Sequence, residues 1–123
     1  MYTLKLEHTF AAAHNLIHAY SEECNREDPH GHNWLVKVNI ESDTLDNGMI
    51  IDFKKIKEVI NELDHRYLNK ILNFEPTAEN LAKYLHDKIL IAAQEKNSER
   101  YIAVEIEIFE GDKASITYSK TNV

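Results

Sequence analysis

The sequence predicts an α+β domain in which a four-stranded antiparallel sheet carries two helices on one face. Four segments alternate apolar and polar residues, as half-buried strands do, and two segments repeat apolar residues at helical spacing. Their order is strand, strand, helix, helix, strand, strand, so neighbouring strands can pair as two hairpins. From the length of 123 residues we expect one domain, spanning residues 1–123.

The first two strands are predicted in residues 2–14 and 30–41. Their apolar residues fall on even positions, which are Tyr2, Leu4, Leu6, Phe10, Trp34, Val36, Val38 and Ile40. Residues 15–29 lose this periodicity and carry Pro29, which favours a long loop. The tripeptide DNG at 46–48 then marks a turn.

The two helices are predicted in residues 53–63 and after Thr77, with Asp52 and Thr77 as their N-caps. The apolar faces of these helices are Phe53, Ile56, Val59, Ile60 and Leu63, and then Leu81, Ala82, Leu85, Ile89 and Ala92. Residues 101–110 alternate again, and residues 114–120 form a last strand after a Gly-Asp turn.

Composition narrows the classes of function. The chain carries 14 Lys and Arg against 21 Asp and Glu, a net charge of −7. This balance argues against nucleic-acid or anionic-membrane binding, since both need clustered positive charge. One cysteine cannot form an intramolecular disulfide, and no apolar run forms a leader or approaches the ~18 residues of a membrane span. We therefore expect a cytoplasmic protein, and open sheet edges favour an oligomer.

Three histidines occupy the apolar register of the first two strands. His30 and His32 project side by side from one strand, and His14 ends the other strand in the same register. An H-x-H pair by itself more often marks partly buried histidines that bond to the main chain. The addition of His14 and of the nearby Cys24 favours a metal, because three neutral imidazoles with an open fourth position are the ligand set of catalytic zinc.

Other polar residues have two interpretations each. Glu110 lies in the apolar register of its strand, where a carboxylate is costly unless it binds a ligand or reaches water at the strand end. Asp64 can set the tautomer of the adjacent His65, or the pair can cap a helix end. Cys24, taken alone, is most often a small buried hydrophobic residue.

Several motifs follow one another along nearly the whole chain: FAAAHNL, a cysteine followed by HGHN, GMIIDF, LDHRYLN, PTAENLA and IFEGD. In this order they resemble those of the 6-pyruvoyltetrahydropterin synthase and 6-carboxytetrahydropterin synthase family. The resemblance implies a T-fold, a homohexamer built from two trimers, and active sites between the subunits.

The resemblance also implies roles for the candidate residues. The implied ligands of a zinc ion (Zn2+) are His14, His30 and His32. The implied catalytic residues are the thiol of Cys24 and the proton-relay pair of Asp64 and His65. The implied substrate-binding residues are Glu110, Thr77, Glu79 and Glu27. The carboxylate of Glu110 can accept two parallel hydrogen bonds from the amino and ring N–H groups of a pterin.

The implied substrate is 7,8-dihydroneopterin triphosphate, whose side-chain hydroxyls become more acidic on zinc. The thiolate and the relay pair would then move protons without a redox cofactor. The compact chain and GMIIDF favour 6-carboxytetrahydropterin synthase of the queuosine pathway. The alternatives are 6-pyruvoyltetrahydropterin synthase, side-chain cleavage to 6-hydroxymethyl-dihydropterin, and a pterin-binding module without catalysis.

Some positions depart from the carboxytetrahydropterin branch. Five residues separate Cys24 from His30, as in the pyruvoyl branch, whereas the carboxy branch commonly has a shorter spacing. Glu27 matches a glutamate that replaces the cysteine in a folate-pathway branch, and it is otherwise a solvated loop acid. The arginine that the family often has after the A-A-H histidine is Asn15 here. The candidates to supply its charge are Arg26, Arg66 and Lys37.

Overall fold

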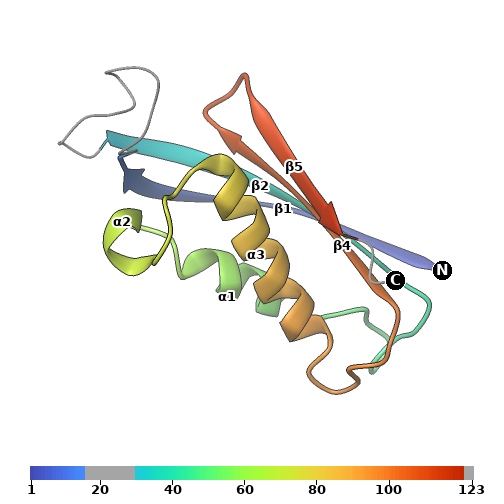
Figure 1. Cartoon of the computed structure of the whole chain (residues 1–123). Coiled ribbons are helices and arrows are strands. Elements are labelled where there is room, and N and C mark those ends of the chain that lie inside the picture. The colour runs from blue at the N-terminus through green and yellow to red at the C-terminus, as the bar shows by residue number, and fades with distance from the viewer. Residues whose placement is uncertain (16–29, 121–123) are drawn as a thin grey trace.

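The computed structural model describes residues 1–15 and 30–120, without the side chain of His30, and has an α+β layer architecture (Figure 1). The elements are β1 (Tyr2–His14), β2 (His30–Ser42), α1 (Phe53–Asn61), β3 (Arg66–Tyr67), α2 (Leu68–Ile71), α3 (Ala78–Ala93), β4 (Ile102–Glu110) and β5 (Ser115–Lys120). Helices α1 and α3 lie on one face of the sheet and contact β1, β4 and β5 (Figure 1). The predicted α+β class is confirmed.

The described sheet has five strands in the order β3-β1-β2-β4-β5. β1 with β2, β2 with β4, and β4 with β5 are antiparallel, whereas β3 pairs parallel to β1. The prediction of four strands, all antiparallel, and of two helices is therefore wrong at β3 and at the short helix α2. β3 has only two residues and α2 only four, so neither is long enough to show a periodic pattern in the sequence.

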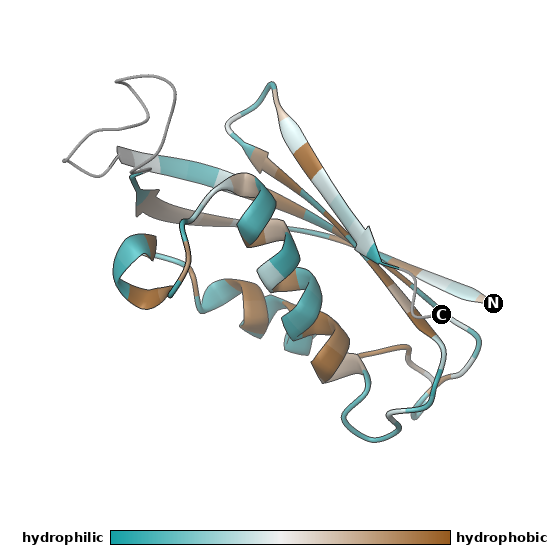
Figure 2. Cartoon of the chain, in the orientation of Figure 1, coloured by the Kyte–Doolittle hydropathy of each residue, from teal (hydrophilic) through white to brown (hydrophobic). Residues whose placement is uncertain are grey.

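The core lies between the helices and the even-numbered residues of the sheet (Figure 2). Phe10 of β1 lies opposite Trp34 of β2, and Val38 lies opposite Ile106 of β4, so the predicted register is confirmed. Trp34 and Ile106 are fully buried. Tyr2 is 53% exposed despite its even position, because its end of β1 extends beyond the helices (Figure 1).

Both predicted N-caps are confirmed. A side-chain oxygen of Asp52 accepts the N–H of Lys54 at 2.9 Å, and the hydroxyl of Thr77 accepts the N–H of Asn80 at 3.1 Å. These bonds satisfy amide groups that lack partners in the first turn of a helix.

The predicted apolar faces hold except at their ends. Phe53, the first residue of α1, is 57% exposed, and Leu63 is buried although α1 ends at Asn61. At the C-terminal end of α3 it is Ala93 that is buried, whereas the predicted Ala92 is only half-buried. Helical spacing predicts which face is apolar, but the extent of the sheet beneath it decides how much of that face is covered.

The predicted DNG turn is confirmed as a tight reversal between Asp46 and Met49, whose main chains exchange hydrogen bonds of 2.7 and 3.0 Å. Asn47 has a φ of 52° and Gly48 a φ of 80°, the positive pair that a type I′ turn requires. Asn and Gly are the residues that adopt these angles at least cost.

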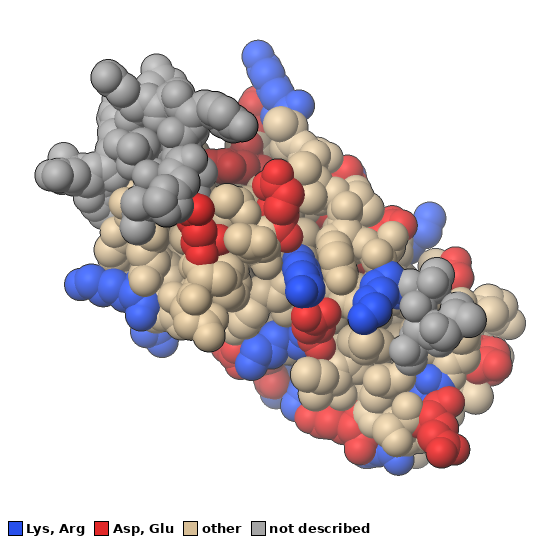
Figure 3. All heavy atoms as spheres, viewed as in Figure 1, with Lys and Arg blue, Asp and Glu red and all other residues tan. Residues whose placement is uncertain are grey.

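Both edges of the described sheet are open over long stretches. β1 is covered by β3 only at Ala12 and Ala13, and β5 pairs only with β4. Acidic and basic side chains are interspersed on the face seen in Figure 3, without a continuous basic patch. Among the described residues, no helix has the length and apolar character needed to cross a membrane. The predicted oligomerisation through sheet edges stays a prediction.

Candidate metal centre and active site

Two histidines and one carboxylate meet where β1, β2 and β4 lie side by side. Glu110 Oε1 is 3.1 Å from Nε2 of His14 and 3.0 Å from Nε2 of His32. The three potential ligand atoms lie within 4.8 Å of one another. The sheet register brings them together, because His32 pairs with Ala12 of β1 and Glu110 pairs with Trp34 of β2.

The orientation of His14 is determined by the loop before α3. His14 is fully buried, and its Nδ1 lies 2.8 Å from the carbonyl oxygen of Pro76. A carbonyl only accepts, so Nδ1 is the donor and a neutral His14 presents a lone pair at Nε2. Main-chain carbonyls that accept a hydrogen bond from the other ring nitrogen commonly hold metal-binding histidines in this tautomer.

The contact between His14 and Glu110 tests whether these residues fit a metal. The lone pair of Nε2 faces a carboxylate oxygen, which is also an acceptor. The contact is attractive only if a proton, carried by either group, or a metal cation lies between the two atoms. Two imidazole nitrogens and one carboxylate oxygen around a shared point fit a divalent transition metal.

Trp34 forms the floor of this cluster. Its ring centroid is 5.1 Å from that of His14 and 5.6 Å from that of His32, both edge-to-face, and it stacks on Phe10 at 5.9 Å. The indole is fully buried, so the two imidazoles rest on a rigid surface. Such packing holds metal ligands in place before a metal arrives.

The remaining predicted residues of this region lie outside the described part. These are Cys24, Glu27 and the side chain of His30. The main chain of His30 pairs directly with that of His14, so the two predicted ligands begin from adjacent backbone positions. The roles assigned to all three stay predictions.

Asp64 and His65 lie at the edge of β1 and are in contact with its main chain. Asp64 Oδ1 accepts the N–H of Ala11 at 2.9 Å, and Asp64 Oδ2 is 3.5 Å from Nε2 of His65. The main-chain N–H of His65 donates to the carbonyl of Ala11 at 2.6 Å, and His65 has a φ of 57°. The imidazole is 83% exposed, and it lines a groove of about 510 Å³ together with His32 and Arg66.

Thr77 and Glu79 lie at the N-terminus of α3. The hydroxyl of Thr77 is engaged as the N-cap, and Glu79 is exposed in the first turn, where a negative charge is favoured by the helix dipole. Their predicted contact with a pterin stays a prediction, as does that of Glu110.

Three further residues hold this region together and were not identified from the sequence. They are Tyr67, Asn69 and Pro76. Tyr67 and Asn69 belong to the LDHRYLN motif, so their proximity to the candidate pair was the available signal. Pro76 acts through its carbonyl, which no side-chain pattern reveals.

Comparisons with known proteins identify relatives of known or assigned activity. The family described as 6-pyruvoyl tetrahydropterin synthase matches residues 3–121. The chain is 36% identical over 90 residues to the dihydroneopterin monophosphate aldolase of Pyrococcus furiosus. This alignment covers 70% of this chain and 76% of that protein. The chain is also 36% identical over 77 residues to an Archaeoglobus fulgidus protein with the provisional name 6-carboxy-5,6,7,8-tetrahydropterin synthase. This second alignment covers 59% of this chain and 63% of that protein.

A solved structure extends the likeness to nearly the whole fold. The 6-pyruvoyl tetrahydropterin synthase of Caenorhabditis elegans superposes with a TM-score of 0.71 at 31% identity, covering 98% of this chain and 96% of that one.

Proposed function

Because the chain belongs to the 6-pyruvoyl tetrahydropterin synthase family, we propose that it is a zinc-dependent lyase that converts 7,8-dihydroneopterin triphosphate into 6-carboxy-5,6,7,8-tetrahydropterin. One observation carries the catalytic part of this proposal. It is the cluster of His14, His32 and Glu110, in which the Pro76 carbonyl holds His14 in the tautomer of a metal ligand. A domain that only bound pterins would not need this arrangement.

We assign the metal to His14, His30 and His32. Zinc, when bound, supplies the Lewis acidity that makes a coordinated substrate hydroxyl and the neighbouring C–H group more acidic. Glu110 lies beside the two described imidazoles with its side chain 32% exposed. This partial exposure supports the proposal that Glu110 accepts hydrogen bonds from a pterin whose side chain reaches the metal.

Protons are moved by two sets of groups in this proposal. Cys24, as the thiolate, removes a proton from the substrate side chain. His65, together with Asp64, donates or accepts a proton on the opposite side of the substrate. His65 is exposed in the single chain, as expected if the active site is completed by a neighbouring subunit. The open edges of β1 and β5 support assembly into the predicted hexamer.

Arg66 is the cation that we assign to the substrate phosphates. It lines the groove that also contains His32 and His65, and none of the described residues lining that groove is acidic. The side chain of Arg66 forms no hydrogen bond or ion pair with the described residues. Lys37, in contrast, lies 3.5 Å from Glu7. Arg26 lies outside the described residues.

A second candidate function is cleavage of the substrate side chain to 6-hydroxymethyl-dihydropterin. The identity of 36% with a dihydroneopterin monophosphate aldolase favours it, together with the presence of Glu27. The 6-pyruvoyl product is the remaining alternative, in keeping with the spacing between Cys24 and His30.

Product identification distinguishes these reactions. The zinc-loaded protein is incubated with 7,8-dihydroneopterin triphosphate and, separately, with the monophosphate, and every product is identified by mass spectrometry. From the triphosphate we expect 6-carboxytetrahydropterin, acetaldehyde and inorganic triphosphate. A hydroxymethyl or pyruvoyl product would transfer the assignment to the corresponding alternative. Unchanged substrate, with metal bound, would leave a pterin-binding protein.

A further inference from the structure

We propose that Asn69 is a positioning residue for the metal centre: it binds the main chain of Asn15 and thereby holds the end of β1, where His14 lies. This inference rests on the proposed function, because it concerns the geometry of the proposed metal ligand.

The segment from Asp64 to Asn69 acts as a substitute edge strand for the end of β1. At its start, Asp64 and His65 bind the N–H and the carbonyl of Ala11. In its middle, β3 pairs with Ala12 and Ala13. The main chain of β1 is therefore held from outside at successive positions as it approaches His14.

Asn69 extends this support one residue past His14. Its side-chain oxygen accepts the N–H of Asn15 at 2.9 Å, and its side-chain amino group donates to the carbonyl of Asn15, also at 2.9 Å. One amide group thus satisfies both main-chain groups of Asn15, as a neighbouring strand would. Both bonds are part-buried, so water competes with them only weakly.

Tyr67 binds the side chain of Asn15. Its hydroxyl donates to the side-chain oxygen of Asn15 at 2.5 Å. The side chain of Asn15 is therefore engaged by Tyr67, while its main chain is engaged by Asn69. The clamp on the end of β1 consists of Asn15, Tyr67 and Asn69.

The clamp matters to the metal because of where it sits along β1. Asn15 directly follows His14, whose imidazole is oriented by Pro76 on one nitrogen and faces Glu110 with the other. A strand end without external hydrogen bonds frays, and fraying at Asn15 would shift the backbone of His14. Partners outside the ligand set that hold a metal ligand commonly change metal affinity about 10–100-fold.

Cobalt(II) titration of the 123-residue protein tests the proposal, because the visible spectrum of bound cobalt reports ligand geometry independently of turnover. Asn69→Ala removes both main-chain bonds, and we expect metal affinity to fall about tenfold with an altered cobalt spectrum. Tyr67→Phe removes only the hydroxyl bond, and we expect a loss of about fivefold. Amide exchange at Asn15 in the metal-free protein should be faster in both variants.

Two further variants make the comparison specific. Asn73→Ala is the matched control, because Asn73 is exposed and forms no hydrogen bond with the described residues. It should keep the affinity and spectrum of the unmodified protein. Asn69→Asp keeps the acceptor for the N–H of Asn15 but turns a second acceptor oxygen toward its carbonyl, so it should lose at least as much metal affinity as Asn69→Ala.

The possible outcomes separate the two proposals. A folded Asn69→Ala protein with unchanged affinity and spectrum would overturn the positioning role, and so would an equal loss in Asn73→Ala. If Asn69→Ala does not fold, Tyr67→Phe decides: unchanged affinity and unchanged exchange at Asn15 overturn the clamp. Failure of the unmodified protein to bind cobalt, with its fold intact, would instead overturn the metal centre itself and the positioning role with it.

Discussion

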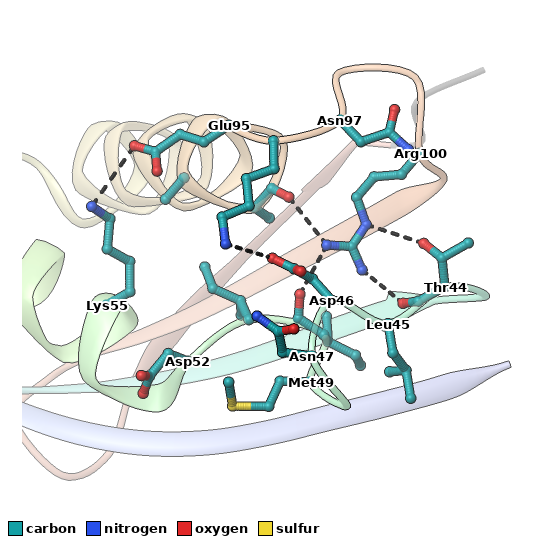
Figure 4. A pocket seen from close by; sticks show the side chains of 15 residues that line it. Thr44, Leu45, Asp46, Asn47, Met49, Asp52, Lys55, Glu95, Asn97 and Arg100 are labelled. Atoms are coloured by element: carbon teal, nitrogen blue, oxygen red, sulfur yellow. Dashed lines mark hydrogen bonds and ion pairs between the residues drawn. The ribbon is translucent and has the colours of Figure 1, made fainter.

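Arg100 links three parts of the chain at the end of the sheet away from the metal centre (Figure 4). Its guanidinium donates to the carbonyls of Ile50, Ala93 and Thr44 at 2.9, 3.3 and 2.7 Å. It also donates to the hydroxyls of Ser42 and Thr44, at 3.1 and 3.2 Å. One side chain therefore joins the end of β2, the turn before α1, and the last turn of α3, where a positive charge is favoured.

The substitution Arg100→Ala removes all of these bonds at once. A hydrogen bond to a charged group contributes about 1.5–3 kcal/mol, but water can replace the outer ones here because the side chain is only half-buried. We therefore expect a loss of about 3 kcal/mol in the free energy of unfolding, close to the value of two charged bonds. With an m-value of about 1.5 kcal/mol/M, the urea midpoint would fall by about 2 M.

Urea unfolding followed by far-UV circular dichroism measures this change, at one fixed protomer concentration because assembly adds to apparent stability. Arg66→Ala is the matched control, since the side chain of Arg66 forms no hydrogen bond or ion pair with the described residues. This variant should stay within about 0.5 kcal/mol of the unmodified protein. Arg100→Lys keeps the charge but not the planar fork, so it should lie in between. A midpoint for Arg100→Ala equal to that of Arg66→Ala would refute the reasoning.

Three other outcomes are expected. Gly48→Ala should destabilise the protein by about 1 kcal/mol in the same urea assay, because a φ of 80° disfavours a side chain. No atom lies within 4 Å of the added Cβ, so the backbone angle alone causes this loss. An unchanged midpoint would contradict the type I′ turn. His14→Ala should lose the metal, measured as zinc per protomer after dialysis, and full zinc content would remove His14 from the ligand set. Cys24→Ala should abolish turnover while keeping zinc, and retained turnover would exclude the thiol as the base.

Periodicity in the sequence predicted the strands and their faces well. The alternation through Ile102, Val104, Ile106 and Ile108 is sufficient to place one face of β4 in the core, because successive strand residues point to opposite faces. The caps at Asp52 and Thr77 were also predictable, since they depend on a few neighbouring residues. The family resemblance stated from the ordered motifs is confirmed by the family match and by the solved relative.

The candidate site was predictable as a set of residue types but not as a set of contacts. Register placed His14, His32 and Glu110 on one face, yet the sequence does not say that the carboxylate lies about 3 Å from both imidazoles. That distance depends on how β2 pairs with β1 on one side and β4 on the other.

The sequence by itself determined the α+β class, the apolar register and the residues that can perform chemistry, because these depend on local spacing. Only the tertiary structure decided that β3 joins the sheet, that Asn69 binds the main chain of Asn15, and that the carbonyl of Pro76 orients His14. Each of these contacts joins residues more than 50 positions apart in the sequence, and His14 and Pro76 are separated by 62 positions. Main-chain groups are the same at every residue, so their partners are decided by which segments the packed core brings together.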